Sequence, residues 1–238
     1  MIRYADDNQK PNKHHSETVK SALRNDERLC RIKTERYFAV FDKSDIDPSD
    51  INNFIHTLDQ LTDSARLLKN GKTSFVTAVT LHGRNYVIKR YNPKGLWHQI
   101  RHTLKHSRAR RGWLNARRLL QLGIPTPRPA GFIEEYNGFL LRRSWLITEL
   151  APGPKLYDYL ADQEIPKEQK TKIIDKVFEI LTLLDQYRIT HGDLKHANLI
   201  VTSDGPTLID LDSLKIHKTG LFYLYHRKKD LNAFRFTP

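Results

Sequence analysis

The sequence predicts an α+β fold in which the first half is rich in β-strands and the second half is mainly helical. Residues 65–91 alternate apolar and polar side chains between glycine-containing turns, which is typical of β-strands. Residues 155–163 and 167–189 instead repeat apolar side chains every three or four positions, which indicates helices. With 238 residues and 39% hydrophobic content, the chain can form one good-sized core or two small ones.

The β-rich half begins after a polar segment. Residues 1–35 show no clear apolar period and predict a polar, flexible N-terminal extension. Residues 36–43 predict a short strand, and 44–61 predict an amphipathic helix behind a Ser or Asp cap. Three strands with turns at NGKTS and HGRN then follow, one ending near Leu68, one from Phe75 to Leu81 and one from Tyr86 to Tyr91.

The next elements lead into the helical half. Residues 94–123 predict a helix that ends at Gly123 and the following IPTPRP. Residues 131–150 predict two strands around an Asn-Gly turn. In the helix predicted over 167–189, one face is apolar and carries Ile173, Ile174, Val177, Ile180, Leu181 and Leu184.

Composition limits the partners and the compartment. The formal net charge of +13 favours phosphate-rich partners such as nucleic acid, anionic lipid or a phosphorylated glycan. Cys30 is the single cysteine, so no intramolecular disulfide can form. No apolar stretch approaches the ~20 residues that span a bilayer, and the first residues lack the apolar centre of a secretory signal. A reducing cytosol is the expected location.

The stretch HGDLKHANLIV, residues 191–201, contains the residues with the clearest chemistry. It matches the H-x-D-L-x-x-x-N loop of protein-kinase-like enzymes, with Asp193 and Asn198 in the places of the proton acceptor and a Mg²⁺ ligand. The following LIVTSDGPTLID predicts a strand-turn-strand ladder that brings Asp210 back as the second Mg²⁺ ligand. Upstream, YVIK places Lys89 on a strand, where it would hold the α and β phosphates of ATP.

These motifs predict a protein-kinase-like, two-lobed fold. The β-rich N-lobe would cover 36–147, and the small helical C-lobe with the catalytic loop would cover 148–238. TELAPG lies where a hinge joins the lobes, so the backbone of Glu149 and Ala151 would contact adenine. Gly71 could contact phosphate through its backbone, or simply form a hairpin turn.

From about residue 65 onward the chain resembles the lipopolysaccharide kinase family, which phosphorylates Kdo or heptose in the inner core of bacterial lipopolysaccharide. HGDLKHANLIV, LIDLDSLK, LGIPTPRPAGF and the terminal KKDLNAFRF carry the resemblance. It implies an ATP- and Mg²⁺-dependent kinase at the cytoplasmic face of the inner membrane of a Gram-negative bacterium, with a glycolipid substrate. It also implies Asp193 as general base, Asn198 and Asp210 as Mg²⁺ ligands, Lys89 as phosphate anchor and Lys195 as charge stabiliser.

The sequence departs from the wider kinase pattern at several positions. Gly192 replaces the Arg of H-R-D that pairs with a phosphorylated activation loop, so activity should not depend on such phosphorylation. No Asp or Glu occurs from 94 to 133, although a helix Glu there normally pairs with the strand lysine. Asn115 takes that place, and Lys89 is expected to pair across the cleft with Asp210. Asp212 is an alternative metal ligand, while the expected role of His191 is structural.

The acid-free stretch is also strongly basic. Residues 94–118 hold eight Lys or Arg, and Trp97, Ile100 and Leu104 could share one helical face, which suits an anionic membrane surface. The basic groups available for lipid anions are Arg108, Arg110 and Arg111. The alternative is that the apolar residues pack on the sheet and the charges are solvated.

Two other functions remain open on the sequence alone. One is another small atypical kinase or ATPase, such as the kinase of the tRNA threonyl-carbamoyl complex, whose basic charge would serve RNA. The other is a membrane-associated pseudokinase, suggested by the missing helix acid. LIDLD and KKDLNAF favour the glycolipid kinase over nucleic acid binding, and the joint presence of Asp193, Asn198 and Asp210 argues against a pseudokinase.

Overall fold

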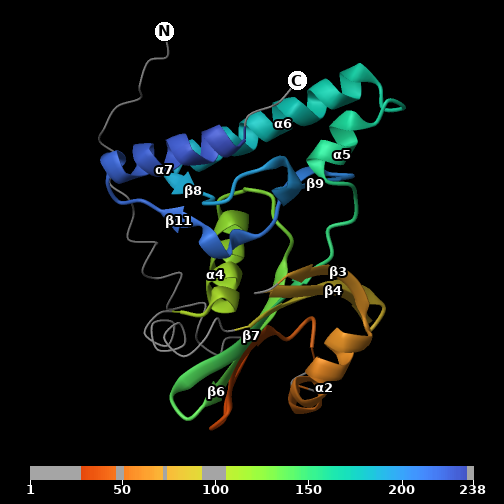
Figure 1. The fold of residues 1–238 in the computed structure, drawn as a ribbon, viewed down its shortest axis with the longest axis vertical. Coiled ribbons are helices and arrows are strands. Elements are labelled where there is room, and N and C mark those ends of the chain that lie inside the picture. Colours follow the sequence, from red (N-terminus) through yellow and green to blue (C-terminus); the bar gives the residue numbers. More distant parts are fainter. Residues whose placement is uncertain (1–27, 47–50, 72–73, 93–105, 235–238) are drawn as a thin grey trace.

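The computed structural model describes residues 28–46, 51–71, 74–92 and 106–234. A seven-stranded sheet in the order β1-β2-β6-β7-β5-β4-β3 forms the β-rich half of the molecule (Figure 1), and all its neighbouring strands are antiparallel. Its strands are β1 (Leu29–Lys33), β2 (Tyr37–Asp42), β3 (Arg66–Gly71), β4 (Ser74–Leu81), β5 (Arg84–Tyr91), β6 (Pro129–Asn137) and β7 (Leu140–Glu149).

All the strands predicted in this half are confirmed, and one strand was missed. β1 lies inside the segment 1–35 that the sequence predicted to be a polar extension, and it pairs with β2 from Leu29 to Lys33. Only Leu29 of β1 is fully buried, and Arg31 and Lys33 interrupt the apolar pattern. Charged side chains are common on such an edge strand, because they discourage pairing with another chain. They also hide the strand from a search for alternating apolar residues.

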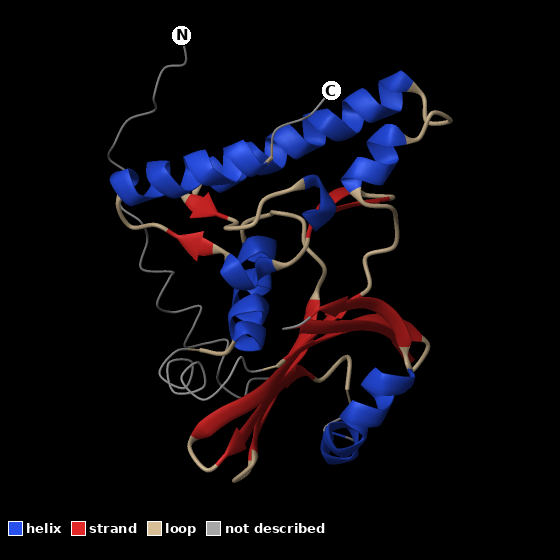
Figure 2. Cartoon of the chain, in the orientation of Figure 1, coloured by secondary structure: helices blue, strands red, loops and turns tan. Residues whose placement is uncertain are grey.

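A different helix covers each of the two faces of the sheet (Figure 2). Helix α2 (Ile51–Ser64) covers one face, where Phe54, Ile55 and Leu58 pack against a core that includes Ile88 and Trp145. Helix α4 (Arg108–Gln121) covers the other face. There, Ala109, Trp113 and Leu114 of α4 pack in a second cluster with Tyr91, Phe132 and Leu146. Because successive side chains of a strand point to opposite faces, Lys89 lies on the α4 face, next to Tyr91.

The helical half has its own core. Helix α5 (Leu156–Ala161), helix α6 (Lys167–Gln186) and helix α7 (Gly220–Ala233) belong to it. On α6, Val177, Ile180, Leu181 and Leu184 are buried, as the apolar period predicted. Short strands complete this half: β9 (Leu199–Thr202) pairs with β10 (Gly205–Leu208), and β8 (Ile189–Thr190) pairs with β11 (Lys215–Ile216).

The helix predicted over 94–123 is shorter in the described residues. His106 and Ser107 are not helical, and α4 begins at Arg108, because the Ser107 side chain accepts a hydrogen bond from the backbone N–H of Arg110 at 3.0 Å. Trp97, Ile100 and Leu104, which the sequence placed on an apolar helical face, lie outside the described residues. Within the described ranges, no helix has the length and apolar character needed to cross a membrane.

A buried carboxylate stabilises the outer end of the sheet. Glu135 of β6 accepts hydrogen bonds from Arg36 Nη2 at 2.7 Å and Arg143 Nε at 2.6 Å. Burial alone would raise the pKa of Glu135, but the hydrogen bonds and charges of Arg143 and Arg36 outweigh burial and lower it. Since the folded-state pKa is lowered, this group stabilises the fold above its ordinary pKa of 4.5, and the contribution is lost as the pH falls.

Replacing Glu135 with glutamine is therefore expected to lower the free energy of unfolding at neutral pH by about 1–2 kcal/mol. Urea denaturation at several pH values would measure it, and the curves of the two proteins should converge in acid. Glu164→Gln, at an exposed glutamate, is the matched control. An equal loss at pH 7 and at acid pH would contradict a role for the Glu135 charge.

Candidate active site

Lys89 of β5 reaches across from the sheet to the helical half. Its ammonium group forms an ion pair with Asp210 and lies 3.9 Å from Asp212 Oδ1, and it stands 5.1 Å from the centre of the Tyr91 ring. The sequence suggested that Asp210 would replace the missing helix acid as the partner of Lys89, and the structure shows this ion pair.

The HGDLKHAN loop brings a second group of polar side chains together. It contains a short 3₁₀ helix, η1 (His196–Asn198). The Asn198 amide donates to the backbone oxygen of Asp193 at 2.8 Å and to its carboxylate at 3.1 Å, while Lys195 Nζ lies 2.7 Å from the same carboxylate. Asp193 is about half exposed, so its carboxylate is held in position while a second molecule can reach it.

The β9–β10 ladder links this loop to Asp210. Leu199 pairs with Leu208, and the backbone N–H of Ile209 donates to the Asn198 carbonyl at 3.0 Å. Asp210 follows in the left-handed conformation, with φ of 66°. This backbone geometry turns its carboxylate toward Lys89 rather than continuing the strand. The ladder therefore brings the backbone of Asp210 close to that of Asn198, and these two residues are the predicted metal ligands.

Asp212 differs from Asp210 in its surroundings. It follows in the 3₁₀ helix η2 (Leu211–Ser213), is almost fully buried and pairs with Arg108 of α4. Burial opposes ionisation of Asp210, but its hydrogen bond with Asp212 and the Lys89 charge lower its pKa well below the ordinary value. Burial and the hydrogen bond with Asp210 raise the pKa of Asp212 instead. Asp210 is thus the more exposed and more readily ionised carboxylate of the pair.

An aspartate of α7 fixes the start of the loop. Asp230 is buried and accepts hydrogen bonds from the backbone N–H groups of His191 at 2.6 Å and Gly192 at 3.0 Å. His191 is itself fully buried, and its Nε2 contacts the Ile209 carbonyl at 3.0 Å. This geometry agrees with the structural role predicted for His191.

The backbone geometry at position 192 explains why a glycine, and not an arginine, precedes Asp193. Its φ is +82°, and a Cβ atom at this position would lie 2.8 Å from the Ser213 carbonyl oxygen. Neither the conformation nor the space suits a side chain.

Gly192→Ala is expected to lower the free energy of unfolding by about 1–3 kcal/mol and to displace the loop that carries Asp193. Gly220→Ala is the matched control, since a Cβ atom added at Gly220 would have no neighbour within 4 Å and its φ is not positive. The control should be neutral or slightly stabilising. Thermal unfolding and phosphoryl transfer would both be measured, and equal behaviour of the two variants would contradict the expected strain.

Asn115 of α4 makes contacts that the sequence did not predict. The sequence placed Asn115 at the position of the helix Glu, with Lys89 paired to Asp210 instead. Its buried amide donates to the carbonyls of Leu211 at 2.8 Å and Leu214 at 3.4 Å. An amide suits this position because it supplies donors to two carbonyls, which a carboxylate cannot do.

The arginines expected at a membrane surface are also engaged within the protein. Arg108 pairs with Asp212, and Arg110 lies 3.7 Å from Glu134 and stacks over Phe38. Arg111 is only partly exposed. This corrects the expectation for Arg108 and Arg110, since burial of α4 against the sheet turns these charges inward.

The predicted hinge is held by a network around Arg128. Its guanidinium donates to Glu149 Oε1 at 2.8 Å and to Asp45 Oδ2 at 2.7 Å, and Tyr86 also donates to Asp45. These hydrogen bonds raise the pKa of Arg128. The N–H of Ala151 donates to no described residue, which leaves it open to a ligand.

Gly71 ends β3 and pairs with Ser74 across the hairpin. The turn between them, residues 72–73, lies outside the described residues. The structure thus places Gly71 in a hairpin, and its contact with phosphate stays a prediction.

The sequence did not predict the roles of three residues in this site: Asp230, Arg108 and Arg128. Asp230 lies in the KKDLNAF segment that was noted for its resemblance, so a signal for it was present. Arg108 was assigned to lipid anions instead, and Arg128 lies within the proline-rich segment IPTPRP. Neither the partner nor the direction of these side chains could be inferred without the fold.

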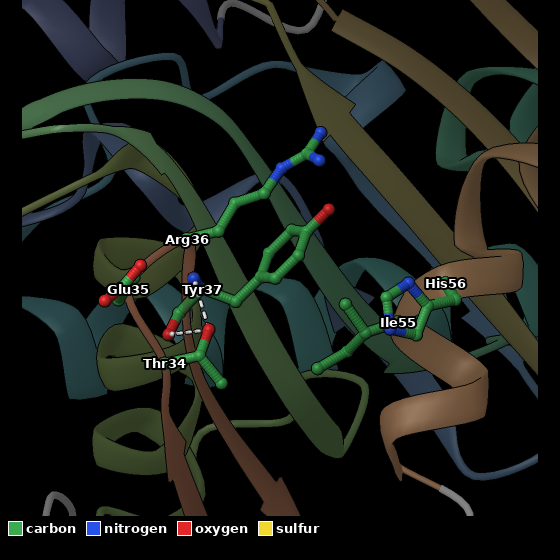
Figure 3. Close-up of a pocket in the computed structure, with 6 residues that line it drawn as sticks. All are labelled: Thr34, Glu35, Arg36, Tyr37, Ile55 and His56. Atoms are coloured by element: carbon green, nitrogen blue, oxygen red, sulfur yellow. Dashed lines mark hydrogen bonds between the residues drawn. The ribbon is translucent and has the colours of Figure 1, made fainter.

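One pocket of the structure lies elsewhere. A hollow of about 380 Å³ opens between the β1–β2 turn and α2 (Figure 3), lined by Thr34, Glu35, Arg36, Tyr37, Ile55 and His56. Ile55 belongs to the core on the α2 face of the sheet, whereas Lys89 lies on the α4 face. The pocket is therefore separate from the candidate active site.

The residues present fit a magnesium ion held together with phosphate. Within the described ranges, no three His, Cys, Asp or Glu side chains form a group that could hold a metal by themselves. Mg²⁺ needs no such group, because it is commonly bound by one or two protein oxygens, phosphates and water. The Asn198 Nδ2 is used by Asp193, and its Oδ1 accepts no hydrogen bond from a described residue. That oxygen and the Asp210 carboxylate form a suitable donor pair.

A strand lysine that meets an aspartate beside an Asp–Asn loop is the arrangement of kinase-like phosphotransferases. Comparison with known proteins narrows this class: the chain belongs to the lipopolysaccharide kinase (Kdo/WaaP) family, which matches residues 58–237. This confirms the resemblance seen in the sequence. Family membership supports a kinase of the lipopolysaccharide core and implies use of ATP.

A solved structure, "WaaP in complex with acyl carrier protein", is similar to this chain. The sequence identity is 18%, the match covers 79% of this chain and 77% of the other, and the TM-score is 0.57. The two proteins therefore share a fold, which supports the kinase-like architecture. No curated protein matches the chain.

Proposed function

We propose that this chain transfers the γ-phosphoryl group of ATP to a hydroxyl of a Kdo or heptose sugar in the lipopolysaccharide inner core. The observation that carries the proposal is the ion pair between Lys89 of the sheet and Asp210 of the helical half, beside the loop that holds Asp193. The ion pair joins Lys89, the proposed phosphate-binding cation, to Asp210, one of the two proposed metal ligands. Family membership supports the lipopolysaccharide core as the substrate class.

Asp193 is the proposed general base. Its carboxylate is half exposed, and a hydrogen bond from the Asn198 amide holds it in position. It would accept the proton of the sugar hydroxyl as the oxygen attacks the γ-phosphorus. Lys195, 2.7 Å from the same carboxylate, would stabilise negative charge on the transferring group.

The nucleotide would lie between the sheet and the helical half, in the two-lobed arrangement that the sequence predicted. Lys89 would contact the α and β phosphates, and the N–H of Ala151 and the carbonyl of Glu149 would contact adenine. Asn198 and Asp210 would hold Mg²⁺. When bound, this ion would neutralise charge on the phosphate oxygens.

The partners follow from the substrate. A core glycolipid is membrane-borne, so we propose that the chain works as a peripheral protein on an anionic inner-membrane surface. The solved structure of WaaP contains acyl carrier protein, which makes an acyl carrier protein a second candidate partner for this chain.

The test is transfer of labelled γ-phosphate from ATP and Mg²⁺, with a deep-rough lipopolysaccharide extract, total tRNA and bulk protein offered in parallel. Label in the glycolipid alone is expected. Hydrolysis of the labelled ATP that is stimulated only by tRNA would instead assign the chain to the RNA-linked kinases. Nucleotide binding without label in any acceptor would identify a pseudokinase and contradict the proposal.

A further inference from the structure

Helix α7 exposes large apolar side chains along its first two turns. Leu221 is 81% exposed, Phe222 67%, Leu224 55% and Tyr225 72%. Side chains of this size cost free energy when a contiguous group of them faces water, so such a group indicates a contact surface. Figure 1 shows α7 at the edge of the helical half that lies away from the sheet.

The opposite side of the same helix is fixed in place. Tyr223 and Arg227 are buried and bind Asp185 of α6, and Asp230 binds the backbone of the catalytic loop. These contacts set the rotation of α7 about its axis. The apolar residues thus cannot turn inward without breaking the contacts that hold the catalytic loop.

The exposed face is also basic. Lys218 precedes the helix and Lys228 and Lys229 follow the apolar residues, and all three are exposed. Asp230 is the only acidic residue between 215 and 233, and it is buried. The surface formed by Leu221, Phe222, Leu224 and Tyr225 with these three lysines, here the α7 outer face, therefore presents apolar and positive groups and no exposed carboxylate.

We propose that the α7 outer face docks on the anionic surface of a lipid bilayer. The apolar side chains enter the boundary between headgroups and acyl chains, while the lysines contact lipid phosphates. The match of charge favours this occupant over a second copy of the chain, which would bring the same positive face. The inference rests on the proposed function only in that a membrane-borne acceptor requires docking, since the docking itself involves no phosphoryl transfer.

The test is sedimentation of the purified full chain with vesicles of phosphatidylethanolamine and phosphatidylglycerol, with phosphatidylcholine vesicles for comparison, at low and high salt. Binding to the anionic vesicles should fall steeply as salt is raised. Phe222→Ser/Tyr225→Ser and Lys228→Glu/Lys229→Glu should each weaken it by about tenfold or more. The matched controls are Phe139→Ser/Tyr157→Ser, at equally exposed aromatic residues, and Lys167→Glu/Lys170→Glu on α6.

Wild-type affinity in both α7 variants, or an equal loss in the controls, would overturn the proposal. The proposal would also be overturned if the wild-type chain did not bind the vesicles and Phe222 and Tyr225 instead formed a dimer contact or bound purified acyl carrier protein. Transfer to a water-soluble, deacylated core oligosaccharide is measured in the same proteins and should be unchanged by the α7 variants. If that transfer is absent from the wild type while vesicle binding persists, the proposed function fails and the docking surface stands.

Discussion

Replacing Asp193 with asparagine is expected to reduce the rate of phosphoryl transfer at saturating ATP by about three orders of magnitude. Asparagine has nearly the same shape but cannot accept the proton of the attacking hydroxyl. The Asp193 side chain is half exposed, so the fold should be retained. Single-turnover transfer to the glycolipid would measure the loss.

Nucleotide binding separates this effect from a folding defect. Asp193→Asn should bind ATP as the wild type does, since the proposed contacts with ATP come from Lys89 and the hinge. Asp204→Asn, at an exposed acid in the β9–β10 turn, is the control and should retain full transfer. Near-normal transfer by Asp193→Asn would remove Asp193 as the base.

Asp230→Asn is expected to have the largest effect on stability together with a large effect on catalysis. Its two carboxylate oxygens accept the N–H groups of His191 and Gly192, and an amide NH₂ would meet one of these donors with another donor. The expected cost is about 2–4 kcal/mol in the free energy of unfolding. Urea denaturation would measure it.

As a positioning residue, Asp230 acts through the loop and touches no substrate. The turnover number should fall while the KM for ATP stays close to its wild-type value, because the hydrogen bonds of Asp230 go to His191 and Gly192 and not to Lys89 or the hinge. Asp175→Asn, at an exposed acid of α6, is the matched control. A loss of stability with an unchanged turnover number would restrict Asp230 to a structural role.

The candidate site was largely predictable because its residues are local in the sequence. Asp193, Lys195 and Asn198 lie within one short loop, and the SDG turn returns Asp210 by a regular ladder. Spacing alone thus fixes which of these groups can meet. Lys89 is distant in sequence, but its strand pattern and motif identified it.

The rest depended on contacts between segments far apart in the chain. Arg108 meets Asp212 only because α4 packs on the Lys89 face of the sheet, and Asp230 meets the loop only because α7 lies over it. β1 was missed because an edge strand with alternating basic residues resembles a polar tail. The sequence also predicted one continuous helix over 94–123, since basic residues with scattered apolar ones retain helical spacing on both sides of the Ser107 cap.

The contacts of α4 with the segment after Asp210 have a consequence for the regulation of the enzyme. In many kinases a helix Glu forms an ion pair with the strand lysine. An outward movement of that helix breaks the ion pair and inactivates the enzyme. Here α4 carries no acid between Arg108 and Gln121, and its Asn115 and Arg108 instead clamp the segment that follows Asp210. An outward movement of α4 would therefore also move the segment that follows Asp210. The position of α4 could not change independently of that segment. We therefore expect a kinase whose activity is not regulated by movement of this helix, so that the concentration of substrate determines the rate.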